Sequence, residues 1–220
     1  MTNTSDPASA QARLPYHHGD LRRALIEATV GLVAERGVER VTIREVARLA
    51  GVSSGAPFRH FKDKTALIQA VAEEGMARLR TAIASSLAQS LSQPPIERLS
   101  AVADAYFSWA CDHPTHYRVL GDRNLIGFYA SHSLVEDNGW IRAETAALFH
   151  AAGAQGHLKS LDLSRTHLQI RALAYGLTRM YVDGHFEEFA ITPDAALSTM
   201  SKTMKDYLLS LTRSDPSGER

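Results

Sequence analysis

The sequence predicts an all-α fold in which a small N-terminal helical domain precedes a larger helical bundle. Apolar residues recur at the spacing of amphipathic helices along most of the 220 residues. Glycines and prolines punctuate these segments, and no alternation of apolar and polar residues is long enough to indicate a sheet.

The first helix is expected to begin after Asp20, which can serve as its N-cap, and to end at Gly37. Its apolar face would carry Leu21, Leu25, Ala28 and Leu32.

The segment from Thr42 to Lys64 predicts two short helices separated by a glycine turn. Thr42 followed three residues later by Glu45 is a capping box, which marks a helix start. Gly51 can end that helix, because glycine adopts the left-handed conformation without a steric penalty. The apolar face of the helix would carry Ile43, Val46, Ala47 and Ala50.

A second short helix is expected to start at Ser53 or Ser54 as N-cap and to run to His60. Pro57 lies in its first turn, where the N–H groups have no acceptor within the helix, so proline is tolerated there. The inward anchors that follow would be Phe61 and Leu67.

The exposed chemistry of this second helix favours DNA over a protein core. Small residues at its start would let the backbone approach base edges, and helix N-terminal amides and cationic side chains favour phosphate. In a helix-turn-helix, the second helix enters the major groove while the first crosses the backbone. We therefore expect base contacts from Ser54, Gly55, Pro57 and Arg59, backbone contacts from Thr42, Arg44, Phe58, His60 and Lys64, and Ser53 at the start of the inserted helix.

This segment resembles the TetR family of bacterial transcription regulators. The family pattern of glycine, threonine, serine, glycine, aromatic residue, histidine-phenylalanine pair and lysine is matched by Gly37, Thr42, Ser53, Gly55, Phe58, His60, Phe61 and Lys64. The resemblance implies an all-helical, usually homodimeric repressor with a variable C-terminal ligand domain. Two positions depart from the pattern, since Pro57 and Phe58 stand where the family has an aliphatic residue and a tyrosine. Phe58 has no hydroxyl to bond a phosphate.

The distribution of charge agrees with a DNA-binding N-terminal domain. The whole chain has a net charge of zero, but residues 13 to 64 carry ten Arg or Lys against six Asp or Glu. Those residues are therefore +4 and the remainder is −4, which concentrates positive potential in one part of the chain. For Arg36 and Arg40, an ordinary solvated helix face is the favoured interpretation.

Composition and length suggest a cytoplasmic protein. Cys111 is the one cysteine, and no apolar run is long enough to cross a bilayer. The expected domains are a disordered arm at residues 1 to 15, a DNA-binding domain at 16 to 64, a ligand-binding and dimerisation domain at 65 to 213, and a tail at 214 to 220. Arg13 in the arm could reach a minor groove or a phosphate, although a frayed terminus is the favoured interpretation.

The larger domain is expected to contain a long helix capped by Asp63, which in the family links the two domains. A shorter helix and a loop are expected between 117 and 129, and further helices near 94–111, 133–152, 164–185 and the C-terminus. The last two predict a dimer if they form a four-helix bundle with a second copy. The equally weighted alternative from the residues alone is that the C-terminal stripe closes the core of a single chain. The resemblance favours the dimer, with interface residues Tyr175, Leu197, Met200, Met204 and Leu208.

The aromatic residues of the larger domain suggest a cavity for an apolar or aromatic small molecule, with no cofactor or metal. The expected lining is Tyr106, Trp109, Tyr117, Phe128, Trp140 and Tyr175. For any single aromatic, a place in the core is the favoured alternative. The segment from 171 to 183 also resembles a TetR subgroup named for a tryptophan, a histidine and a glycine, of which only Gly176 is matched here.

Two rival classes remain open, an enzyme and a protein-binding scaffold. His113 with His116, and His150 with His157, could supply a zinc site or a general base, but no HExxH motif occurs. A scaffold would leave the chemistry of the Thr42 to Lys64 segment unexplained. The sequence therefore predicts a DNA-binding transcriptional regulator that is not an enzyme. It would be a repressor released from a palindromic operator by a small-molecule effector, with activation on the same fold as the alternative.

Overall fold

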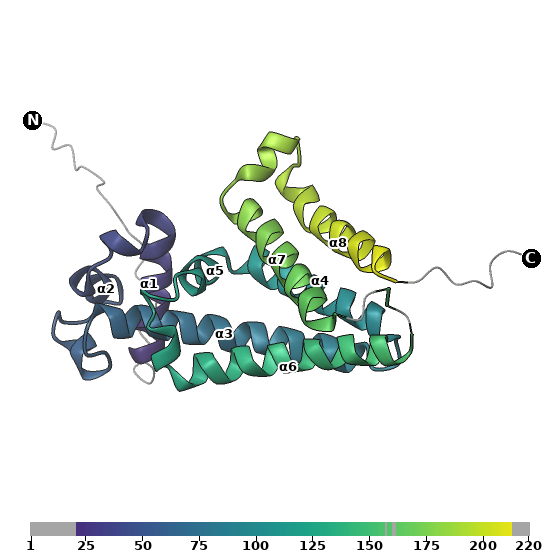
Figure 1. Cartoon of the computed structure of the whole chain (residues 1–220). Coiled ribbons are helices and arrows are strands. Elements are labelled where there is room, and N and C mark those ends of the chain that lie inside the picture. The colour runs from purple at the N-terminus through teal and green to yellow at the C-terminus, as the bar shows by residue number, and fades with distance from the viewer. Residues whose placement is uncertain (1–20, 157, 160–161, 213–220) are drawn as a thin grey trace, which may run out of the picture. The chain divides into compact units, whose positions relative to one another are not determined.

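The computed structural model describes residues 21–156, 158–159 and 162–212, and these form helices, turns and one isolated β-bridge. The predicted all-α fold is confirmed, because the described residues contain no β-strand (Figure 1). No helix in these ranges has the length and apolarity to cross a membrane. The N-cap expected at Asp20, the arm with Arg13, and the tail lie outside the described residues.

The chain divides into two compact units after Val71. We call residues up to 71 the N-terminal unit and residues from 72 the C-terminal unit. The sequence predicts this boundary after residue 64, which is the first residue of α3 (Lys64–Gln89). In the structure the two units divide within α3, after Val71.

The N-terminal unit contains α1 (Leu21–Arg36), the 3-10 turn η1 (Val38–Arg40), α2 (Ile43–Leu49), the 3-10 turn η2 (Ala56–Arg59) and the start of α3. The predicted apolar faces supply its core, in which Leu25, Val46 and Leu67 are fully buried. Phe61 is also buried, and the guanidinium of Arg22 lies 5.6 Å from the centre of its ring. The inward anchors predicted after the second short helix are confirmed.

The long helix α3 begins where the sequence predicts. The backbone N–H of Ala66 donates to Oδ1 of Asp63 at 2.8 Å, so Asp63 caps the helix. The helix ends at Gln89, ahead of the two prolines that open the next helix.

The C-terminal unit is a helical bundle built around α4. Its elements after α3 are α4 (Pro95–Asp112), α5 (Pro114–Gly121), η3 (Phe128–Ala130), α6 (His132–Ala154), α7 (Leu163–Val182), η4 (His185–Phe189) and α8 (Pro193–Ser210). Helix α4 packs against α6, α7 and α8, and α8 lies alongside α7 (Figure 1). Pro114 ends α4 as expected but is also the first residue of α5, so this helix starts before Tyr117.

The apolar stripe of α8 lies inside this bundle. Met200 and Met204 are 0% exposed and Leu208 is 1% exposed in the single chain. The assignment of these three residues to a dimer interface is therefore wrong, because α4 and α7 of the same chain already cover that face of α8. Leu197 and Tyr175, by contrast, are exposed.

Candidate nucleic-acid interface and ligand cavity

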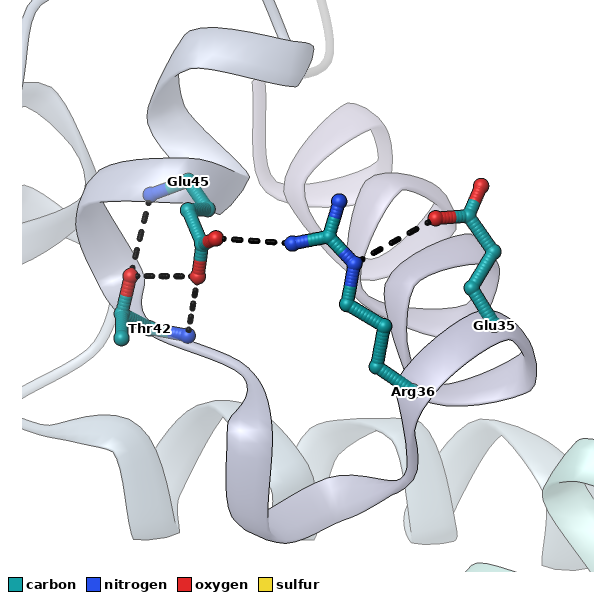
Figure 2. A network of polar contacts seen from close by, with 4 residues as sticks. All are labelled: Glu35, Arg36, Thr42 and Glu45. Atoms are coloured by element: carbon teal, nitrogen blue, oxygen red, sulfur yellow. Dashed lines mark hydrogen bonds and ion pairs between the residues drawn. The ribbon is translucent and has the colours of Figure 1, made fainter.

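The start of α2 is held by the predicted capping box (Figure 2). The backbone N–H of Glu45 donates to the Thr42 hydroxyl at 3.3 Å, and the backbone N–H of Thr42 donates to the Glu45 carboxylate at 3.2 Å. The Thr42 hydroxyl also donates to this carboxylate at 2.8 Å. Its one proton is therefore already used, so Thr42 orients α2 and has no free O–H to offer a phosphate.

Arg36 joins this network from the end of α1. Its guanidinium lies 2.9 Å from the Glu45 carboxylate and 3.6 Å from that of Glu35 (Figure 2). The hydrogen bond from Thr42, followed by the charge of Arg36, holds the pKa of Glu45 below its ordinary value of 4.5. Arg36 is thus tied to α2 rather than simply solvated.

The turn after α2 has the geometry that the glycine predicts. Gly51 has a φ of +72°, and its N–H donates to the carbonyl of Arg48 at 3.2 Å. The N–H of Val52 donates to the carbonyl of Ala47 at 3.0 Å. These two bonds form a Schellman motif, which ends α2 and redirects the chain.

The second element is shorter than predicted. In place of a helix from Ser53 or Ser54 to His60, the chain forms the 3-10 turn η2, which no side chain caps. The carbonyl of Pro57 accepts from the backbone N–H groups of both His60 and Phe61, each at 2.9 Å. That pair of bonds closes the turn, and the burial of Phe61 then draws the chain back to the core before an α-helix can continue.

Most residues predicted to face DNA are exposed on this element and on α2. The exposed members of the set are Thr42, Arg44, Ser53, Ser54, Gly55, Phe58, Arg59 and His60. Two members of the set are not exposed, Pro57 and Lys64; the ring of Pro57 is buried, so its predicted base contact is wrong. Phe58 is 56% exposed, which leaves a large apolar ring in solvent beside these polar residues.

Lys64 is half-buried and already has a partner. Its ammonium donates to the backbone carbonyl of Glu39 at 2.9 Å, so it ties the start of α3 to η1. A neutral carbonyl does not cancel its charge, and two of its three protons remain for other acceptors.

Three arginines give the exposed face its charge. Arg44, Arg48 and Arg59 are exposed, and none forms an ion pair with a described residue. Residues 21–71 hold nine Arg or Lys and five Asp or Glu, a net charge of +4. Arg48 was absent from the predicted set, although its position four residues after Arg44 places both on one side of α2.

Gly55 has a backbone conformation that any residue can adopt. Its φ is −88°, and a Cβ built there would meet nothing within 4 Å. The fold of this chain therefore does not require glycine at this position, unlike at Gly51. A small residue here keeps the backbone of the turn open to close approach by another molecule.

Comparison with known proteins identifies this arrangement. The family model for bacterial regulatory proteins of the tetR family matches residues 25–71, and a tetracyclin repressor-like C-terminal domain model matches residues 99–204. The transcriptional regulator BetI of Cronobacter sakazakii is 32% identical over 165 residues, which cover 74% of this chain and 76% of BetI. The chain belongs to the TetR family. It is a transcriptional regulator with an N-terminal helix-turn-helix.

Solved structures agree with this membership. A protein of unknown function from Rhodococcus sp. RHA1 has 31% identity and a TM-score of 0.70, covering 89% of this chain and 98% of its own. The TetR family regulator PfmR from Thermus thermophilus has the same fold, with a TM-score of 0.66 at 15% identity, covering 84% of this chain and 97% of its own. TetR regulators bind DNA and typically dimerise. Assignment to the tryptophan-histidine-glycine subgroup remains a prediction.

The C-terminal unit of this TetR chain contains a cavity of about 310 Å³, and residues of its lining, among them Arg171 and Tyr175, are exposed to solvent. Five of the six aromatic residues predicted to line it do so, namely Tyr106, Trp109, Tyr117, Phe128 and Tyr175. Trp140 does not line it, and the guanidinium of Arg80 lies 5.0 Å from the centre of its ring. Burial raises the pKa of Tyr117, so this phenol stays neutral, and it donates to the backbone carbonyl of Tyr175 at 3.2 Å.

The cavity also has polar residues that the aromatic pattern did not reveal. One lies in the segment between α5 and η3, two on α6 and two on α7; in that order they are Arg123, Asn138, Thr145, His167 and Arg171. Their spacing gives no signal in the sequence, because the bundle brings together residues from separate helices.

The histidines raised as metal ligands do not form a metal site within the described ranges. The rings of His113 and His116 lie 5.7 Å apart, and Nε2 of His116 lies 3.8 Å from the Glu74 carboxylate. His150 is exposed, and His157 lies outside the described residues.

Proposed function

We propose that this TetR-family regulator is a homodimeric repressor that occupies an operator and leaves it when a small molecule enters the C-terminal unit. The observation that carries the proposal is the exposed face of η2 and α2. There, an open glycine backbone and two serines stand beside arginines that have no acidic partner among the described residues. Repression would follow from occupancy, because a protein on the operator excludes polymerase from the same DNA.

In this proposal, the residues divide into two kinds of contact. Ser53, Ser54, Gly55 and Arg59 face base edges, where an arginine can donate two hydrogen bonds to guanine. Arg44, Arg48, His60 and Lys64 face phosphates, and Phe58 reaches the DNA with an apolar ring that can touch a thymine methyl group.

The dimer is proposed to form through exposed apolar side chains of α7 and α8. Leu168 is 66% exposed and shares one face of α7 with Tyr175, and Leu197 is exposed on the neighbouring α8. Two copies of a helix-turn-helix can read two half-sites about 34 to 36 Å apart, which multiplies the affinity of one short element.

The effector is proposed to bind the cavity of the C-terminal unit. A ligand can shift the protein away from DNA only if it binds the DNA-incompetent state more tightly. A compound with equal affinity for both states would leave the operator occupied.

Sequencing the genomic fragments retained by the purified full-length chain tests the proposal. We expect a palindromic site that overlaps a promoter. Sites without two-fold symmetry would contradict the dimer, and sites placed consistently upstream of a promoter would favour activation.

A further inference from the structure

The cavity of the C-terminal unit has a positive charge that no described residue of its wall neutralises. Arg123 and Arg171 line it, and no Asp or Glu is found among the described residues of its wall. Most of the remaining wall is apolar, and includes Ile83, Val102 and Phe149. An apolar chamber with two cations is suited to a molecule with an apolar body and a negative end.

Arg171 is held in place by a neutral group. Its Nη2 donates to the amide oxygen of Asn138 at 3.0 Å, and it forms no ion pair with a described residue. Partial loss of water around the guanidinium, and then the charge of Arg123, lower the pKa of Arg171. Arg171, a residue of the cavity wall, remains exposed to solvent, and two cations that repel each other are stabilised when an anion binds between them.

Arg123 is likewise oriented without a carboxylate. Its Nη1 donates to the Tyr129 hydroxyl at 3.1 Å, and its guanidinium lies 4.1 Å from the centre of the Phe128 ring. Stacking on an aromatic face restricts the guanidinium while leaving further N–H groups to donate.

His167 does not supply the charge. Burial, and then the charges of Arg171 and Arg142, lower its pKa, so the ring is neutral near pH 7. Its Nε2 lies 3.1 Å from the Thr145 hydroxyl. The two arginines, which keep their charge over the whole physiological range, therefore set the electrostatics of the cavity.

We infer that the effector of this regulator is an amphipathic monoanion, a carboxylate on an apolar or aromatic body, whose charged end is bound by Arg171 and Arg123. The inference rests on the proposed function, since it names the ligand class of the same cavity. Asn138 positions Arg171, and the apolar wall takes the body of the ligand. The cavity volume of about 310 Å³ is at the lower end of the range for small-molecule sites.

The aromatic wall offers the competing possibility of a quaternary ammonium ligand, because such rings can bind cations. Two arginines in the same cavity oppose that ligand by like-charge repulsion. A matched set of probes therefore discriminates the classes: decanoate, decanol and decyltrimethylammonium, which share a chain and differ in charge.

The test is titration calorimetry of the full-length chain with each probe, repeated on Arg171→Gln, Arg123→Gln and the control Arg165→Gln. Arg165 is exposed on α7 and does not line the cavity. We expect decanoate to bind most tightly, and each cavity variant to weaken it by about tenfold to a hundredfold, as loss of a charge-assisted hydrogen bond predicts. Decanol binding should not change, and Arg165→Gln should match the parent protein.

Tighter binding of the cation, decanoate affinity that the cavity variants leave unaltered, or no decanoate binding at millimolar concentration would overturn the inference. Release of a retained DNA fragment is measured separately with the same probes. If decanoate binds through the arginines but releases no DNA, the ligand class stands and the proposed induction fails. If decanol or the cation releases DNA and decanoate does not, the ligand class fails and induction stands.

Discussion

Arg59 and Arg44 are both exposed and unpaired among the described residues, but they lie on different elements of the helix-turn-helix. Arg59→Ala should remove discrimination at one base pair, worth about 1–3 kcal/mol, since η2 faces base edges in the proposed complex.

Arg44→Ala should instead weaken binding to every duplex and lower the salt slope by about 0.9 for the phosphate it no longer neutralises. Fluorescence anisotropy with matched and single-mismatch duplexes at several salt concentrations measures both effects.

Arg40→Ala is the control for these variants. Arg40 is exposed on η1 and is not assigned to DNA, so its removal should leave discrimination intact and change the slope little. If Arg59→Ala lowered affinity for all duplexes equally and kept discrimination, η2 would be a phosphate-binding element instead.

Two glycines of this segment should respond differently to substitution. Gly55→Val should unfold close to the temperature of the parent and lose operator binding, because a Cβ at this position meets no protein atom within 4 Å but the added side chain holds the turn away from DNA. Gly51→Ala should lower the free energy of unfolding by roughly 1–2 kcal/mol, since its φ of +72° strains any Cβ. Thermal unfolding and anisotropy distinguish the two. Full operator affinity in Gly55→Val would show that DNA docks elsewhere.

The residues around Thr42 show what local sequence can predict. The capping box and the left-handed Gly51 depend on contacts within a few residues, and both were predicted correctly. The burial of Pro57 was not, because it depends on how the short η2 lies against the core, and spacing along the chain carries no record of that.

At the scale of one element, α2 depends on an ionised carboxylate. Because the pKa of Glu45 is lower in the folded chain than its ordinary 4.5, its contribution to stability is present above that value and is lost as pH falls through the folded pKa. The difference in unfolding free energy between the parent and Glu45→Gln should therefore be constant near neutrality and shrink below about pH 4.5.

Denaturant unfolding at several pH values measures this difference. Glu39→Gln is the matched control, because it removes an exposed carboxylate of the same unit that forms no ion pair with a described residue. A Glu45→Gln difference that stays flat down to pH 3 would contradict the role of the ionised capping box.

Substitutions at buried and at exposed positions of α7 and α8 should affect folding and dimerisation separately. Met204→Asp should prevent folding, because it places a carboxylate where the side chain is 0% exposed. Leu168→Asp should leave a folded chain with half the parent mass in sedimentation, while Leu91→Asp, exposed outside these helices, should keep the parent mass. If Met204→Asp gave a folded monomer, Met204 would belong to the dimer interface and not to the core of the single chain.

The error over α8 has a simple physical origin. Periodicity identifies which face of a helix is apolar, but it does not say whether the same chain or a second copy covers that face. In this chain α4 and α7 cover it.

At the scale of the whole molecule, the sequence predicted the helical architecture and the presence of a cavity better than the chemistry of that cavity. Aromatic density is visible in composition, and five of six predicted aromatics line the space. The arginines that determine its charge come from separate segments, and only the tertiary packing of the C-terminal unit brings Arg123, Asn138 and Arg171 to one cavity.

The central claim is that η2 lies against the edges of duplex DNA, once in each of two subunits. Cys111 is the one cysteine of the chain, so Ser54→Cys in a Cys111→Ser background gives a single thiol on the exposed turn for an iron-chelate cleavage reagent. We predict that this protein, bound to a retained genomic fragment, cuts the DNA at two positions about 34 to 36 Å apart, whereas the Cys111→Ser protein treated with the same reagent, which has no thiol, does not. Bound DNA left uncut from position 54, or a folded chain that ignores all duplex DNA at low salt, would contradict the claim.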